Sequence, residues 1–304
     1  MKRFVLVLIS LATCLYAAAQ GTAMDFIRAD RNPATLGTAG AGYASTESGT
    51  AFSALGNVSA VPLATQKLHA AGTFGLAPAG EGQAFSYGSG VSFKLGRIGI
   101  AAACVGSNYP EVPLYSDGGG ASGRFAPMDV TVGLGFSVAV TDYISIGALA
   151  RYAAQTLDSK NTLSSLNADV MAMYKRDALS ISAGVIALGS NVESISNRKY
   201  SLPASARLAA AYELGFGDFA LDILADGDYY FSGNMSAAAG VQADWRKMVF
   251  LRTGYRYSSV ADNFIAAPVP SFFSVGAGVK LVGISLDVAW ISSGTLAASL
   301  GYSF

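Results

Sequence analysis

Cysteine and histidine are nearly missing from this chain of 304 residues, which has two cysteines and one histidine. Cys14 falls inside a predicted signal peptide, so Cys104 would stand alone in the mature chain, and we expect neither an internal disulfide nor a cysteine metal site. His69 is the one histidine that could act as a catalytic base, and no Gly-x-Ser-x-Gly nucleophile motif accompanies it. We therefore expect no catalysis, no metal and no cofactor.

A surplus of charge and a long apolar run are missing as well. The 20 basic and 20 acidic residues cancel to a net charge of zero, which argues against nucleic acid as a partner, because such binding needs a basic field. Hydrophobic residues make up 52% of the chain, yet no apolar run beyond the N-terminal segment reaches the roughly 20 residues of a membrane helix. This combination indicates a large buried core, or a barrel whose apolar face is divided among alternating strands.

The N-terminus indicates the compartment. A basic start is followed by an apolar run to Leu15 and by three alanines before Gln20. This order is typical of a secretory signal peptide, to which we assign residues 1–19. A lipoprotein signal ending at Cys14 is the weaker alternative, because Thr13 is unfavourable before the cysteine and the apolar run continues after it.

The C-terminus shows the pattern of a membrane strand. From Leu296 to Phe304, apolar side chains alternate with small or polar ones. A strand with lipid on one side and a wet lumen on the other requires this period of two. Outer-membrane barrels usually end on a phenylalanine that the insertion machinery recognises. We therefore assign Tyr302 and Phe304 to a C-terminal assembly signal, with the barrel-assembly machinery as partner.

The rest of the mature chain repeats this pattern about fourteen times. The alternating segments are expected at 67–77, 84–95, 98–106, 127–140, 143–156, 166–175, 178–188, 202–214, 217–226, 235–246, 248–258, 272–281, 283–292 and 295–304. Their length and their β-branched and aromatic content favour strands over helices. The fold class that follows is all-β: a transmembrane antiparallel β-barrel of about 14 strands, surrounded by outer-membrane lipid and lipopolysaccharide.

The links between these segments alternate in length. Tight turns are expected at 96–97, 141–142, 176–177, 215–217, 247 and 282–283. Longer links are expected at 107–126, 157–165, 189–201, 227–234 and 259–271. Short periplasmic turns and longer outer loops alternate in this way in outer-membrane barrels. The pattern predicts an integral protein of the bacterial outer membrane with an even strand number and both termini in the periplasm.

Charged residues of the strands share the polar parity and are expected to face the lumen. The candidates are Arg151, Arg207, Asp222, Asp244, Arg252, Arg256 and Asp287. A charge on the lipid face would cost roughly 2–4 kcal/mol at mid-bilayer. Because the signs are mixed, we favour a salt-bridged interior over a polar path for a solute. Tyrosines near the predicted strand ends suit interfacial girdles: Tyr152, Tyr174, Tyr212, Tyr230, Tyr255, Tyr257 and Tyr302.

Residues 20–66 do not follow the strand pattern. The run Leu-Gly-Thr-Ala-Gly-Ala-Gly-Tyr-Ala carries Gly37, Gly40 and Gly42, and it is followed by Glu47 and by Asn57 before Pro-Leu. It resembles the N-terminal region of the PorV/PorQ family, FadL-like outer-membrane barrels of Bacteroidetes, although Val-Ser-Ala follows the asparagine where the family usually has Pro-Ala. The resemblance implies that residues 20–66 form a hatch that plugs a barrel spanning 67–304. A flexible linker is the alternative for the glycine run.

Three functions remain open. The PorV/PorQ resemblance implies an accessory component of the type IX secretion system, with secretion-system components and secreted proteins as partners. A FadL-like channel for hydrophobic small molecules is the alternative, and a structural porin is the third. The first reading needs an outer loop that binds protein. Link 107–126 is the candidate, with Tyr109, Leu114 and Tyr115 as its contact residues.

Overall fold

The computed structural model describes residues 23–47, 50–115, 121–156, 161–190, 192–193, 199–262 and 269–304. The predicted signal peptide and Cys14 lie outside these ranges. Among the described residues, no helix is long and apolar enough to cross a membrane.

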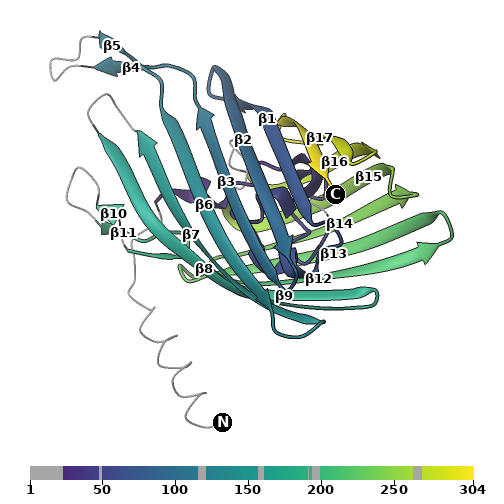
Figure 1. Cartoon of the computed structure of the whole chain (residues 1–304). Helices are drawn as coiled ribbons and strands as arrows, with labels where there is room; N and C mark the ends of the chain where they lie inside the picture. Colours follow the sequence, from purple (N-terminus) through teal and green to yellow (C-terminus); the bar gives the residue numbers. More distant parts are fainter. Residues whose placement is uncertain are drawn as a thin grey trace, which may run out of the picture.

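Fourteen antiparallel strands close into a barrel, and this confirms the predicted fold class (Figure 1). Each predicted segment corresponds to one strand. The strands of the wall are β1 (Leu68–Ala79), β2 (Gly82–Leu95), β3 (Ile98–Asn108), β6 (Met128–Ala139), β7 (Ile144–Thr156), β8 (Thr162–Arg176), β9 (Leu179–Gly189), β12 (Ser205–Phe216), β13 (Phe219–Tyr230), β14 (Met235–Trp245), β15 (Val249–Asp262), β16 (Val269–Leu281), β17 (Ile284–Ile291) and β18 (Leu296–Ser303). The wall closes where β1 pairs with β18, in a register that joins His69 to Ser303.

The two faces of the wall differ in chemistry, as the period of two requires. In β6, Leu134 and Phe136 point outward with 64% and 55% of their surfaces exposed. The alternate residues Asp129 and Ser137 are buried inside. Exposed large apolar side chains occur on every strand of the wall, so the outer surface forms an apolar belt. Such a surface is stable against lipid and would be costly in water.

Six tight connections lie at one end of the barrel, which we call the turn end. They occupy 96–97, 140–143, 177–178, 217–218, 246–248 and 282–283. The other end, the loop end, carries the longer links. Two of these links hold short hairpins that the sequence did not predict: β4 (Val112–Tyr115) with β5 (Ala121–Phe125), and β10 (Val192–Glu193) with β11 (Lys199–Tyr200). The alternation is incomplete, because the loop-end connections at 80–81 and 292–295 are also short.

Strand β13 corrects one predicted boundary. The sequence pattern ends this strand at residue 226, whereas the structure continues it to Tyr230. Tyr230 is consequently buried inside the barrel with 8% of its surface exposed, so its assignment to an interfacial girdle is wrong. Tyr230 shares the inward parity of Asp226 and Asp228, and its ring makes a cation–π contact at 5.2 Å with the guanidinium of Arg28.

Residues 23–66, called the hatch below, lie within the lumen (Figure 1, purple). They form four short helices: η1 (Asp25–Arg28), α2 (Pro33–Leu36), η2 (Thr50–Phe52) and η3 (Val58–Leu63). The hatch starts at the loop end, where the amide of Ala23 donates to the carbonyl of Ser201 at 2.9 Å. It finishes at the turn end, where Lys94 Nζ donates to the carbonyl of Ala64 at 2.6 Å. The periplasmic location of the N-terminus stays a prediction, because residue 1 lies outside the described ranges.

Candidate functional site

The hatch is tied to the wall by a cluster of three arginines around Asp228. Arg28 of η1 contacts this carboxylate at 2.5 Å. Arg207 of β12 binds it with two hydrogen bonds of 2.7 and 2.8 Å, and Arg256 of β15 approaches to 3.3 Å. The Asp228 side chain is fully buried. The buried carboxylate of β13 therefore joins the hatch to three strands of the wall, β12, β13 and β15, and such charge-assisted bonds are strong where water is excluded.

A second contact forms at the glycine run. The backbone amides of Gly42 and Tyr43 donate to the two oxygens of Asp226, at 3.0 and 3.2 Å. Gly42 has φ +144°, a conformation that L-residues rarely adopt, so this glycine lets both amides face one carboxylate. The ring of Tyr43 lies 4.5 Å from the guanidinium of Arg207. Burial, and next the charge of Asp169, raise the pKa of Tyr43 above its ordinary value.

Gly37 and Gly40 serve the same stretch in different ways. A Cβ on Gly37 would lie 3.1 Å from the Cα of Gly276, so the hatch backbone nearly touches β16. Ser274 Oγ donates to the carbonyl of Gly37 at 3.0 Å. Gly40 has φ 78° and turns the chain after α2. These positions explain the glycine run by close packing and sharp turning inside the lumen.

Asn57 organises the end of the hatch. Its Oδ1 accepts from the amide of Ser59 at 3.1 Å and so caps η3. Its Nδ2 donates to the carbonyl of Tyr43 at 2.7 Å and to Ser182 Oγ of β9 at 3.0 Å. The asparagine thus links two parts of the hatch and the wall without a following proline. Glu47 is half-buried, and its amide donates to Ser45 Oγ at 3.3 Å.

The other predicted lumen charges also lie on the inner face, where most of them have a nearby partner. Arg252 joins Asp287 at 2.6 Å. The side chain of Gln242 bridges Arg252 and Asp222, with distances of 2.6 and 2.8 Å. Asp244 accepts from the amide of Lys247 at 3.0 Å, beside the turn end. Neutralisation by near neighbours lowers the cost of placing these charges inside the barrel.

Arg151 has a different role, because it lies on the more apolar side of the lumen. It pairs with Asp169, and its Nη1 donates to the hatch carbonyl of Leu55 at 3.3 Å. Asp169 also accepts from the backbone amide of Ala187 at 2.6 Å. Ala187 has φ 57° and lies at a β-bulge between β8 and β9. The ion pair therefore holds an irregular part of the wall in place.

An apolar cluster fills the contact between the hatch and strands β3, β7, β8 and β9. Its members from the hatch are Met24, Ile27, Ala51, Phe52, Ala54, Val58 and Val61. Its members from the wall are Ala101, Ala103, Val105, Leu149, Ala153, Met171, Ile186 and Ala187. Val192 and Leu202, from the link between β9 and β12, complete the cluster. This cluster is larger than the two apolar clusters that the hatch forms with β13–β18, and we call it the apolar side of the lumen. The ion pairs of Asp228 and Asp287 lie on the other side, along β12–β17.

Pairing in the wall weakens where this apolar cluster reaches the loop end. The ladder between β9 and β12 ends at the pair Ile186 and Ser205. Strand β9 continues to Gly189 and so runs beyond its β12 partner. Ile186 and Leu202 are both buried here, with 3% and 4% of their surfaces exposed. Beyond the pair of Ile186 and Ser205, β9 therefore has no ladder partner in β12, and the buried Ile186 and Leu202 mark this end of the ladder.

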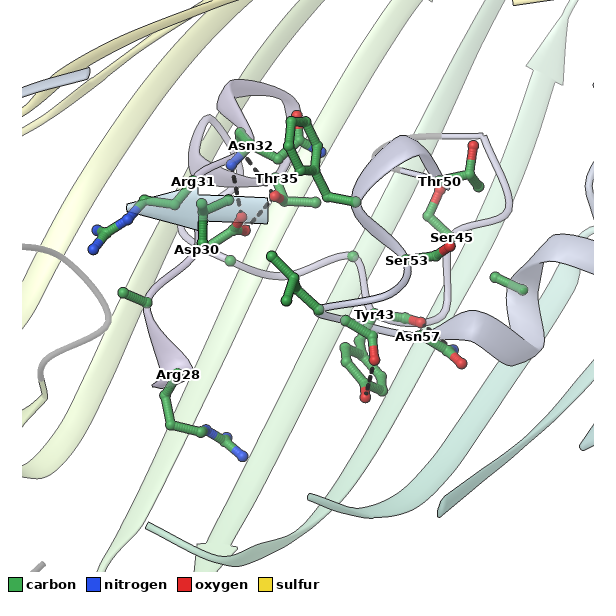
Figure 2. Close-up of a pocket in the computed structure, with 18 of the residues that line it drawn as sticks. Arg28, Asp30, Arg31, Asn32, Thr35, Tyr43, Ser45, Thr50, Ser53 and Asn57 are labelled. Atoms are coloured by element: carbon green, nitrogen blue, oxygen red, sulfur yellow. Dashed lines mark hydrogen bonds between the residues drawn. The ribbon is translucent and has the colours of Figure 1, made fainter. Parts of the chain in front are cut away.

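Small polar cavities remain between the hatch and the wall. One of about 100 Å³ is lined mainly by hatch residues, including Asp30, Asn32 and Ser53 (Figure 2). Asp30 accepts from the hydroxyl of Thr35 and from the amide of Asn32. Burial nevertheless raises the pKa of Asp30 above its ordinary value. Among the described residues, no group of three or more His, Cys, Asp or Glu side chains could hold a metal ion.

Three important residues of this site are not evident from the sequence. The predicted strand ends at residue 226, so Asp228 falls in the predicted link 227–234 although it shares the parity of Asp222. Asp226 shares the parity of Asp222 at the predicted end of the strand, but nothing in the sequence pairs it with the amides of Gly42 and Tyr43. No local sequence pattern identifies Arg28 as a site residue, because its partner Asp228 lies 200 positions away in the chain.

The predicted outer contact residues do not form one surface among the described atoms. Tyr109 is half-buried, and its hydroxyl donates to Asp129 at 2.7 Å. Leu114 lies in β4 and is half-buried. The side chain of Tyr115 lies outside the described part of the structure. At the C-terminus, Tyr302 and Phe304 are exposed on the outer face with ring centroids 6.2 Å apart.

The closed wall and the plugged lumen define a hatch-bearing barrel of the outer-membrane type. No family model and no curated protein matches the chain. Solved structures do match in fold. The toluene transporter TodX of Pseudomonas putida aligns with a TM-score of 0.65 and 11% identity, covering 90% of this chain and 98% of its own. The toluene transporter TbuX of Ralstonia pickettii gives 0.61 and 11%, covering 91% and 98%.

A FadL homologue of Pseudomonas aeruginosa aligns with a TM-score of 0.58 and 11% identity, covering 90% of this chain and 98% of its own. The fold is therefore that of FadL-like outer-membrane barrels. These neighbours are transporters or a FadL homologue, and none of the three is described as an enzyme. The finer resemblance to PorV/PorQ rests on the sequence motif alone.

Proposed function

We propose that this protein is an outer-membrane channel that admits small hydrophobic molecules when its hatch moves. The observation that carries the proposal is the apolar side of the lumen. It runs beside the hatch and reaches the place where β9 and β12 stop pairing. A hydrophobic solute would exchange contacts with apolar side chains along this side, so leaving water would favour its entry. The FadL-like fold of the neighbouring transporters supports the same reading.

A plugged lumen argues against a general porin. The cavities between hatch and wall are about 100 and 60 Å³, well below the roughly 300–1,000 Å³ of pockets that hold drug-sized ligands. Transport therefore requires displacement of the hatch. Arg28 can move away with the hatch without leaving the buried carboxylate of Asp228 unpaired, because Asp228 keeps Arg207 and Arg256 as partners.

The secretion reading has weaker support. It depends on the PorV/PorQ motif and on an outer loop that binds protein. Tyr109 and Leu114 are each half-buried, and the Tyr109 hydroxyl is bound to Asp129. The neighbouring structures favour the channel, and we therefore place it first.

A reversible lock on the hatch tests the proposal. A Cβ on Gly135 would lie 3.0 Å from the Cβ of Val58. A disulfide needs roughly 3.5–4.5 Å between the two Cβ atoms, so an outward shift of the hatch by about half an ångström allows the bond. Cells that carry Val58→Cys and Gly135→Cys, with Cys104 replaced by serine, would be assayed for uptake of radiolabelled toluene. We expect uptake to fall at least fivefold when the pair is oxidised and to recover after reduction.

The control is the single variant Val58→Cys in the same background, whose uptake should not respond to oxidant. A strain that lacks this protein is the second comparison. If it takes up toluene as fast as wild-type cells, the proposal of a channel for toluene-like molecules is rejected. Loss of secreted proteins in the deletion strain, with hydrophobic uptake unchanged, would establish the secretion reading instead. If uptake continues after the disulfide has been shown to form, the solute does not need displacement of the hatch.

A further inference from the structure

Three cavities follow one another through the barrel. Their volumes are about 10, 100 and 60 Å³. Asp30 and Arg31 line both the first and the second cavity. Asn32 and Phe52 line both the second and the third. The cavities are therefore neighbours, and two pairs of hatch side chains form the partitions between them.

This row of cavities extends from one end of the barrel to the other. The smallest cavity is lined by Ala77 and Thr295, which lie at the loop end of β1 and just before β18. The third is lined by Gln66 and Ser303, at the turn end. The smallest cavity borders β1, β2 and β18, and the third borders β1 and β14–β18. The middle cavity lies mainly within the hatch and touches the wall at Val105 of β3 and Arg207 of β12.

Buried polar atoms without a hydrogen-bond partner occur along this row. They include Arg31 Nε, Asn32 Nδ2, Ser53 Oγ and Gln66 Oε1, and none of the four has a partner among the described residues. Arg31, Asn32 and Ser53 are at least nine-tenths buried, with 8%, 6% and 4% of their surfaces exposed. Leaving such a group unsatisfied costs about 1–3 kcal/mol. Four of them beside adjoining cavities point to a small hydrogen-bonding occupant.

We propose that the three cavities form a path for water through the barrel while the hatch stays in place. A cavity needs a volume of roughly 10–15 Å³ to hold one water molecule. The smallest cavity therefore admits water in single file and excludes a hydrated ion. The orphan groups supply hydrogen bonds along the way: Arg31 at the first partition, Ser53 in the middle and Asn32 at the second. Thermal movement of the Phe52 ring would open the second partition.

This activity is distinct from the proposed transport of hydrophobic molecules. The apolar side of the lumen requires hatch displacement, whereas the row of cavities exists with the hatch seated. Either activity can therefore fail without the other.

Osmotic shrinkage of liposomes tests the path. The full chain would be reconstituted, and the shrinkage rate would be followed by stopped-flow light scattering after a sucrose jump. We expect the intact protein to raise the rate at least twofold over protein-free liposomes. Ser53→Leu fills the middle cavity and should return the rate to the protein-free value. Phe52→Ala removes one side of a partition and should raise the rate several-fold above that of the intact protein.

The matched control is Val61→Ala, because Val61 is a buried hatch residue of the same apolar cluster that lines none of these three cavities. Its rate should equal that of the intact protein. An equal rise for Val61→Ala and Phe52→Ala would overturn the proposal, since it would show general loosening of the hatch. If Ser53→Leu does not fold, Phe52→Trp provides a second narrowing of the path. An intact protein no faster than protein-free liposomes would also overturn it.

Discussion

Asp228 shows how a single residue can hold two parts of the molecule together. Its carboxylate accepts from Arg207 and Arg28 and lies 3.3 Å from Arg256. A lone buried carboxylate would be very unstable, and three buried arginines without an anion would repel one another. The carboxylate and the arginines therefore stabilise one another, but their contributions are unequal. Two arginines belong to the wall, and only Arg28 belongs to the hatch.

This asymmetry predicts unequal effects of two substitutions. Asp228→Asn should destabilise the folded barrel by about 3–5 kcal/mol, because three arginines lose their counter-charge. Arg28→Met should cost less, about 1–3 kcal/mol, because Asp228 keeps two partners. The measurement is the urea midpoint of the heat-modifiable form in detergent. Equal losses for the two variants would show that the wall arginines do not stabilise Asp228 independently of the hatch.

At the scale of elements, the hatch and the wall fit through inward-facing glycines. Glycines of seven wall strands leave room for hatch atoms at positions where a Cβ would collide: Gly90, Gly99, Gly133, Gly135, Gly147, Gly240, Gly254 and Gly276. The backbone of Thr38, for example, lies directly over Gly254 of β15. Close approach of two backbones requires the absence of a side chain. The wall is therefore shaped for this hatch in this position.

Gly254→Ala should weaken the seating of the hatch. The added methyl group would overlap the carbonyl of Thr38, and overpacking of this kind costs typically about 1–3 kcal/mol. We expect faster trypsin cleavage after Arg28 and Arg31, measured by mass spectrometry of the reconstituted protein.

Gly215→Ala is the matched control, since a Cβ at Gly215 meets nothing within 4 Å. Its cleavage rate should equal that of the unmodified chain. Unchanged cleavage in Gly254→Ala would mean that the hatch shifts over β15 without loss of stability.

At the scale of the whole molecule, closure of the wall depends on the chain end. The carbonyl of Phe304 accepts from the amides of Lys67 and Leu68 at 2.6 and 3.0 Å. The amide of Phe304 donates back to the carbonyl of Leu68 at 3.1 Å. These bonds extend the seam between β1 and β18 to the turn end. An open seam would leave backbone groups unpaired in lipid, which costs several kcal/mol for each group.

Deletion of Phe304 should therefore lower the yield of the folded barrel severalfold. The readout is the heat-modifiable band in outer-membrane fractions. Phe304→Leu keeps the backbone bonds and the apolar surface, so it should retain most of the yield if closure is the main role. Equal, severe loss in both variants would indicate that assembly depends on the aromatic ring itself.

The sequence by itself determined the barrel, its strands and the two faces of its wall. These follow from local alternation, because lipid accepts only apolar side chains and every backbone group in it needs a partner. Even so, the end of β13 was missed. Gly227 and Asp228 are poor strand residues on their own, and only the distant arginines make a strand favourable there.

Tertiary structure alone decided how the lumen is organised. Polar parity showed that Arg207, Arg256 and Asp287 face inward, but not which charges meet. The pairing of Arg28 with Asp228 spans 200 positions, and no local pattern carries such information. The same holds for the row of cavities and for the apolar side of the lumen. Both arise where one irregular segment meets strands from every part of the chain.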